Sequence, residues 1–133
     1  MNTTRSLRSL ALAQAFSLAV AFGAEAASED YAFALASSEP NPGPGVDIAV
    51  SLTDLRSNTP VSGAVIFATR LDMAPDGMEA MTAPVEVMPE GKPGIYHFKA
   101  DLVTGGNWRL RIAAKVQGEA ETVQGEMTLG VQP

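Results

Sequence analysis

The 133-residue chain contains no cysteine and only one histidine. The missing thiols exclude disulfide bonds, thiolate metal sites and cysteine nucleophiles. A single imidazole excludes a zinc site built from several histidines. A type-1 copper centre is excluded as well, because it requires a cysteine and two histidines. Any metal chemistry of this chain must therefore use other ligands.

The chain also lacks the short motifs of the common enzyme classes. A nucleophile elbow, an HExxH zinc motif, a P-loop and a dinucleotide-binding fingerprint are all absent from the sequence. The one histidine, His97, has no evident orienting partner, so a catalytic triad is not expected. The sequence predicts a protein that is not an enzyme.

Positive charge is scarce, with nine Lys and Arg residues against fifteen Asp and Glu residues and a net charge of -6. Such a chain is poorly suited to nucleic acid, whose phosphates require a basic surface. Hydrophobic residues make up 46% and charged residues 18% of the sequence, which is typical of a folded globular domain. The length favours one such domain.

The N-terminus has the layout of a secretory signal peptide. Arg5 and Arg8 precede a nearly apolar run at residues 10–23, which ends before the small-residue pattern Ala24-Glu25-Ala26. We therefore predict a signal peptide at residues 1–26, cleaved near Ala26, and a periplasmic domain at residues 27–133. The alternative is an uncleaved membrane anchor, but the run is shorter than the roughly 20 residues that span a bilayer.

Beyond residue 26 the sequence alternates as β-strands do, and no segment predicts a helix. Turn signals recur about every 8 to 12 residues. This spacing predicts an all-β fold, an antiparallel two-sheet sandwich of about seven strands, immunoglobulin-like or cupredoxin-like. The predicted strands are 31–35, 46–52, 65–71, 85–87, 95–101, 108–116 and 123–131.

The strand at 108–116 has the clearest pattern of the seven. Trp108 begins its apolar face, which we expect to lie in the sandwich core. Arg109, Arg111 and Lys115 lie on the other face and form a basic stripe. This stripe is either an ordinary solvated sheet face or a docking surface for an acidic partner.

Three of the six methionines, Met73, Met78 and Met81, fall in the segment Asp72–Met81. Proline and glycine interrupt this segment, so it is predicted to be a loop. Thioether sulfur is a soft, neutral ligand that prefers Cu(I) or Ag(I) to hard cations, and it needs no deprotonation to bind. The flanking carboxylates of Asp72, Asp76 and Glu79 could attract a cation. Alternatively, the methionines form a hydrophobic lid or a partner surface.

Three further residues belong to the same question. Met88 is predicted as a fourth metal ligand or as a core residue. His97 alternates with Tyr96 and Phe98, so it is expected to face outward, and it joins the methionines only if its strand lies under the loop. Met127 lies on the apolar face of the last strand and is expected in the core.

The order of these elements resembles the FixH-like/YtkA-like family of small exported β-sandwich domains. The resemblance is carried by GVDIAVSLTD, by TPVSGAVIFATRLDM and by PGIYHFKADLVTGGNWRLRIAAKV, and it covers roughly residues 45–131. It implies a role in handling copper and other soft metals. The segment Asp72–Met81 resembles that of the members associated with efflux.

Together, the residues and the resemblance predict a periplasmic protein that binds Cu(I) or Ag(I). The predicted metal ligands are Met73, Met78, Met81 and Met88, with His97 as a weaker candidate. Such a protein would act in copper tolerance or metal delivery, with an efflux or oxidase-assembly protein as partner. The alternative is a sandwich module that binds such a partner without any metal.

Overall fold

The computed structural model describes residues 29–37 and 39–133, so the predicted signal peptide lies outside the described residues. The described chain forms nine β-strands and one short 3₁₀ helix, η2. These elements are β1 (Tyr31–Leu35), β2 (Gly43–Asp54), β3 (Thr59–Pro60), β4 (Val65–Met73), η2 (Ala74–Asp76), β5 (Met78–Ala83), β6 (Val85–Val87), β7 (Ile95–Leu102), β8 (Gly106–Lys115) and β9 (Val123–Val131).

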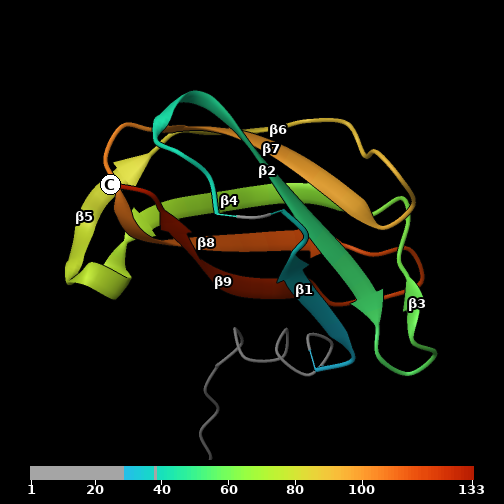
Figure 1. Ribbon diagram of the computed structural model, residues 1–133. Helices are drawn as coiled ribbons and strands as arrows, with labels where there is room; N and C mark the ends of the chain where they lie inside the picture. The colour runs from blue at the N-terminus through green and yellow to red at the C-terminus, as the bar shows by residue number, and fades with distance from the viewer. Residues whose placement is uncertain (1–28, 38) are drawn as a thin grey trace, which may run out of the picture.

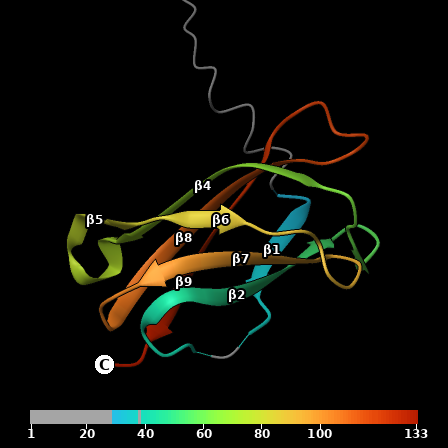
Figure 2. The ribbon, with the colours of Figure 1, turned by 90° about the horizontal axis from the view of Figure 1, so that it is seen from above.

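The strands form two antiparallel sheets (Figure 1). Sheet A has the order β1-β2-β7-β6, with β3 paired to β2, and sheet B has the order β5-β4-β8-β9. Viewed from above, β6 continues the line of β5, so the chain passes from sheet B to sheet A in one extended stretch (Figure 2). The predicted all-β sandwich of two antiparallel sheets is confirmed.

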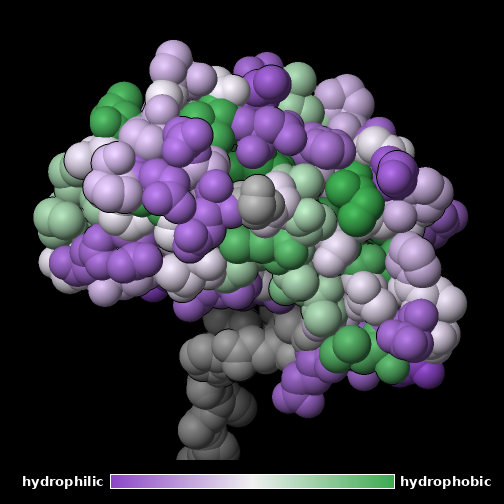
Figure 3. Space-filling model, in the orientation of Figure 1, coloured by the Kyte–Doolittle hydropathy of each residue, from purple (hydrophilic) through white to green (hydrophobic). Residues whose placement is uncertain are grey.

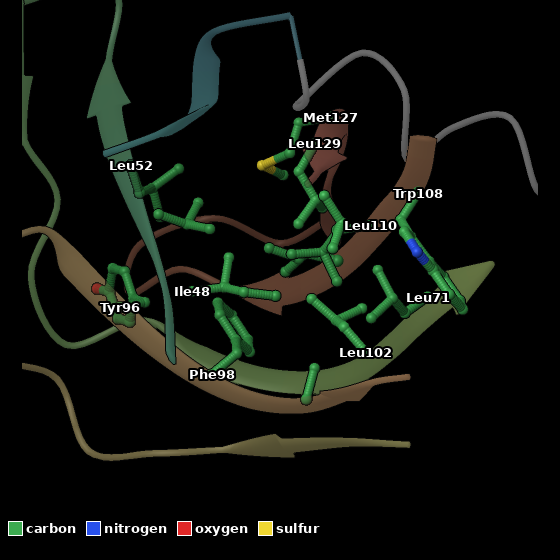
Figure 4. Close-up of a cluster of buried hydrophobic side chains, with 14 of the residues drawn as sticks. Ile48, Leu52, Leu71, Tyr96, Phe98, Leu102, Trp108, Leu110, Met127 and Leu129 are labelled. Carbon is green, nitrogen blue, oxygen red and sulfur yellow. The ribbon is translucent and has the colours of Figure 1, made fainter. Parts of the chain in front are cut away.

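The hydrophobic core fills the space between the two sheets (Figure 4). Alternate residues point inward because successive side chains of a strand lie on opposite faces. On β8, Trp108 is 1% exposed, and its indole Nε1–H donates to the carbonyl oxygen of Thr104 at 3.1 Å. Met127 is buried on β9. The expected core positions of Trp108 and Met127 are therefore confirmed.

The structure contains more strands than the seven expected from the sequence. Thr59–Pro60 forms the two-residue strand β3, although its proline and polar neighbours are typical of a turn. The segment expected to be a loop contains the end of β4, the helix η2 and the start of β5. The two strands that the sequence did not predict, β3 and β5, lie at sheet edges. An edge strand pairs on one side only, and its sequence alternation is weak.

The surface seen in Figure 3 mixes hydrophobic and hydrophilic side chains. Hydrophobic residues there lie among hydrophilic ones, as on most folded domains. Across the described ranges, no helix has the length and apolar character needed to cross a bilayer.

Candidate functional site

The segment Asp72–Met81 forms a tight hairpin between β4 and β5. Strand β4 ends at Met73, and η2 begins with a proline near its start, where the fixed φ of proline fits a helix. Gly77 then adopts a left-handed conformation, with φ of 76°, and its N–H donates to the carbonyl of Ala74 at 2.9 Å. This turn returns the chain to β4 as strand β5. The proline and the glycine therefore shape a hairpin.

Asp72 is the only buried charged residue among those described, with 0% exposure. It lies on the outer face of sheet B, where Arg109 donates to it from Nε at 3.1 Å and from a terminal nitrogen at 2.8 Å. Arg70 Nε donates at 2.7 Å, and the N–H of Ala74 donates at 3.0 Å. These hydrogen bonds, led by those from Arg109, hold the pKa of Asp72 far below its usual range although burial opposes the shift.

Asp76 attaches the far end of the hairpin to the beginning of β8. Its carboxylate accepts hydrogen bonds from the backbone N–H and from the side-chain amide of Asn107, both at 2.9 Å. These bonds lower the pKa of Asp76. Gly106 leaves the necessary space, because a Cβ there would lie 2.7 Å from both Asp76 Oδ2 and Met73 Cε. The buried thioether of Met73 and the carboxylate of Asp76 therefore both lie against the Gly-Gly-Asn turn.

Strand β5 bulges away from β4. Asp72 pairs with Thr82, and the next residue, Met73, pairs with Met78, so three residues of β5 have no counterpart on β4. Bulges bend the strand that carries them, so Met78 and Met81 do not lie on a regular strand, along which three residues span about 10 Å. Glu79 anchors the bulge, because its carbonyl accepts from Arg70 at 3.0 Å and its carboxylate from Arg109 at 3.1 Å.

The three methionines of the hairpin lie in different environments. Met73 is 2% exposed and belongs to the core, whereas Met78 and Met81 are 43% and 41% exposed on β5. The register pairs Met73 with Met78, which places their Cβ atoms about 5 Å apart. The hairpin therefore presents two accessible thioethers, with a third buried next to one of them.

Met88 and His97 lie elsewhere on the molecule. Seven residues of nearly continuous extended chain separate Met81 from Met88, a span of roughly 20 Å. The N–H of Met88 donates to the carbonyl of His97 at 2.9 Å, so these two residues are neighbours across sheet A. His97 faces outward as expected, with its Nδ1 3.4 Å from a carboxylate oxygen of Asp47. The structure thus separates the five predicted ligands into a hairpin group and a sheet A pair.

The carboxylates of the hairpin are engaged in contacts within the protein. Asp72, Asp76 and Glu79 all accept hydrogen bonds from described residues, as detailed above. No cluster of three or more His, Asp or Glu side chains suited to a metal ion occurs within residues 29–37 and 39–133. The chemistry that the hairpin offers is therefore that of the thioethers.

Two residues of this arrangement were not predicted from the sequence. Arg70 is the outward neighbour of Asp72 on β4, and Asn107 follows the Gly-Gly pair at the start of β8. Alternation along 65–71 could have placed Arg70 on the outer face. Its partnership with Asp72 depends on the pairing of β4 with β8, which the sequence alone does not give.

Comparison with known proteins shows the family to which the chain belongs. The model of the YtkA-like family matches residues 25–113. The chain belongs to the YtkA-like family. The matched range contains the whole hairpin, and it ends within β8. The predicted resemblance to this family is confirmed.

The YtkA-like chain has no match among the curated proteins. Among solved structures it is similar to the crystal structure of the Lin-41 filamin domain, with 20% identity, a TM-score of 0.46 and coverage of 79% of this chain and 94% of the other. It is also similar to the ZirS C-terminal domain, with 14% identity, a TM-score of 0.43 and coverage of 98% and 88%.

Proposed function

We propose that this YtkA-like domain binds a soft monovalent metal ion, Cu(I) or Ag(I), through Met78 and Met81. The observation that carries the proposal is the pair of half-exposed thioethers on the bulged edge strand β5. In a chain without cysteine, thioethers are the soft ligands available, and they prefer these ions to zinc and to hard cations. The family resemblance described above, which implies copper handling, supports the same assignment.

The surroundings of the two thioethers suit a site that exchanges metal. An edge strand is open on one side, so a partner can approach the ligands directly. The arginine contacts of Glu79 fix the bulge between Met78 and Met81, so the backbone is organised before an ion arrives. Met73 would join as a third ligand only by leaving the core, where it is 2% exposed.

This function needs no catalysis, and we propose a non-enzymatic protein that carries metal outside the cytoplasm. Copper tolerance or metal delivery is the corresponding role, with an efflux or oxidase-assembly protein as donor or acceptor. Export rests on the signal-peptide pattern of residues 1–26. The intact mass of the protein recovered from the periplasm tests it, because retention of these residues would contradict cleavage near Ala26.

The deciding experiment is an anaerobic titration of Cu(I) shared between the protein and a chromogenic chelator. The wild-type protein should withdraw Cu(I) from the chelator. The double variant Met78→Leu/Met81→Leu should lose this competition, because leucine keeps the apolar volume and removes the sulfur. Met127→Leu is the matched control, since Met127 is a core methionine on β9, and it should compete like the wild type.

Each result of the titration has a clear meaning. If the double variant competes as well as the wild type, Met78 and Met81 are not the site, and Met88→Leu with His97→Ala tests the sheet A pair. If no protein competes, the metal function is wrong. The exposed methionines would then serve the alternative function, contact with a partner protein without metal.

A further inference from the structure

The outer face of sheet B carries an unusual pairing of charges. Arg70 on β4 and Arg111 on β8 are register partners, so two cations lie directly opposite each other on neighbouring strands. Such like-charge pairs are normally unfavourable. Both side chains are also accessible, with 45% and 43% of their surface exposed. The pair thus presents positive charge to solvent.

Nearby acids neutralise this pair only in part. Asp72 is fully buried beneath the arginines, and its carboxylate, which accepts from Arg70 Nε at 2.7 Å, offsets one of their positive charges. Arg111 lies 3.7 Å from Asp72 and 3.9 Å from Glu79, beyond hydrogen-bond distance. Its partner in the register on β9 is Glu126. The face also carries Arg109 and Lys115, so its four cations exceed its three acids, Asp72 included, on a chain whose net charge is -6.

A shallow groove begins beside the two arginines. Its volume is about 550 Å³, and Ala68, Arg70, Arg111, Ala113, Gln124 and Glu126 are among the residues that line it. Ala68 and Ala113 are register partners, and their small side chains leave the face low at this point. A depression with small apolar side chains at its floor and with Arg70 and Arg111 on one wall can receive a side chain from a partner.

Apolar side chains lie exposed just beyond the groove. Phe67 is 54% and Val65 is 62% exposed on β4, and the ammonium group of Lys115 lies 5.9 Å from the centre of the Phe67 ring. Ala68 is two residues from Arg70, which corresponds to about 7 Å along the strand. The same distance separates alternate side chains of an extended peptide. Such a peptide can therefore place one side chain in the groove at Ala68 and the next but one at Arg70.

We propose that the outer face of sheet B binds an extended acidic segment of a partner protein. A carboxylate of the segment contacts Arg70 and Arg111, and an apolar side chain two residues away fills the groove against Phe67. The charge of the face, opposite to that of the rest of the chain, selects an acidic partner and accelerates its approach. This proposal concerns recognition alone and does not depend on metal binding.

A synthetic peptide of about nine residues, roughly 30 Å when extended, provides the probe. Glutamate and one central phenylalanine occupy alternate positions, with threonine between them. A control peptide replaces every glutamate with lysine. Amide chemical shifts of the ¹⁵N-labelled protein should change on β4, β8 and β9 with the acidic peptide only, and binding should weaken as salt rises from about 20 mM to about 150 mM.

Variants of the face test the contacts one at a time. Arg111→Gln should weaken binding at least about tenfold, and Phe67→Ala by several-fold. Lys99→Gln is the matched charge control on sheet A, and Val103→Ala is the matched apolar control, since Val103 is 75% exposed outside the face. Neither control should alter the affinity. Unchanged shifts of core amides in each variant establish that the sandwich is intact.

Several outcomes would overturn the proposal. Absence of binding at millimolar peptide, equal binding of both peptides, or shifts located on sheet A would each do so. Inorganic phosphate is titrated in parallel. If it produces the same shifts with the same affinity, and Phe67→Ala has no effect, the arginine pair binds free anions only. Peptide-independent shifts that grow with protein concentration would instead identify a second copy of the chain as the occupant.

Discussion

Asp72 keeps a carboxylate out of contact with solvent on an outer sheet face. Burial of a charge is costly unless hydrogen bonds replace those of water. Here Arg70, Arg109 and a backbone N–H supply them. One short side chain thereby joins β4 to β8 and also fixes the first residue of η2. Asp72 acts as the anchor of the hairpin rather than as a free ligand.

Replacement of Asp72 with asparagine should destabilise the protein. The substitution leaves Arg109 and Arg70 without the charge that they enclose, and loss of one partner of a buried ion pair is strongly destabilising. We expect a loss of about 2 to 4 kcal/mol in the free energy of unfolding, because the arginines remain partly in water. Denaturant unfolding monitored by Trp108 fluorescence measures it.

Asp47→Asn is the control for this variant. Asp47 lies on sheet A, and its side chain is half exposed beside His97. A surface substitution of this kind changes stability by about 0.5 kcal/mol or less. Equal effects of the two substitutions would mean that the ion cluster around Asp72 contributes nothing beyond a surface contact.

The hairpin from β4 to β5 combines firm anchors with an open edge. Asp72 and Asp76 connect its base and its turn to β8, while β5 pairs with β4 on one side only. Local openings of a fold begin at such weakly paired elements. The stability of β5 is therefore expected to depend on side-chain anchors more than on its own ladder.

Asp76→Ala removes one anchor without touching the core. Backbone amides of β5 should then exchange with deuterium at least about tenfold faster, whereas those of β7, and of β8 beyond Asn107, whose own N–H loses its acceptor, should keep their wild-type rates. Hydrogen exchange followed by NMR resolves the two groups. Uniform acceleration in all strands would indicate global destabilisation and contradict a local anchoring role.

The sequence predicted most strands, including the short β1 and β6 with the bounds observed, but it missed β3 and β5. Alternation along 95–101 and 108–116 is produced by the core that these strands enclose, so the pattern and the burial coincide. β3 and β5 have little alternation, since an edge strand has few buried positions. Their pairing is decided by β2 and β4, which lie earlier in the chain.

The same reasoning explains what was predicted of the site. Counting methionines and noting Pro75 and Gly77 located the hairpin, but spacing alone could not tell which thioether enters the core. Met73 continues the inward alternation of Leu71 on β4, and this became clear only once β4 was known to extend to residue 73. The roughly 20 Å to Met88 follows from the passage between sheets, which no local pattern reveals.

Hydrogen bonds lower the pKa values of several carboxyl groups across the molecule. Hydrogen bonds from Arg56 lower the pKa of Asp54, and backbone hydrogen bonds from Gly63 and Gly94 lower that of Glu90. Asp72 and Asp76 are lowered in the same way. At the other extreme, burial and a hydrogen bond to Glu119 raise the pKa of Tyr31 to about 12.

These shifts predict a stability that declines at both ends of the pH range. A lowered carboxylate stabilises the fold above its unfolded pKa of about 4, and this contribution is lost as the pH falls through the folded value. A raised tyrosine stabilises the fold below its unfolded pKa of about 10 and ceases to do so as the pH rises through the folded pKa of about 12. Thermal melts from about pH 2 to pH 12 measure both declines.

Two variants test whether Asp72 causes the loss of stability at low pH and Tyr31 the loss at high pH. Asp72→Asn should lose less stability than the wild type between about pH 5 and pH 2, since asparagine does not titrate. Tyr31→Phe should lose less than the wild type above about pH 10, because it has no phenol to ionise. If a variant has the same pH profile as the wild type, the replaced residue does not cause the corresponding loss of stability.

Within the hairpin, the residues that determine its shape differ from those that it exposes to solvent. This difference affects how such a domain changes over evolutionary time. Its shape depends on Asp72, Asp76 and Gly77, whereas the side chains at 78 and 81 project from the strand and support little of the interior. Mutation can therefore exchange the displayed groups while selection on folding is satisfied elsewhere. A library randomised at positions 78 and 81 should yield mostly folded proteins with diverse ligand preferences, which makes the hairpin a cassette for engineering recognition on a disulfide-free scaffold.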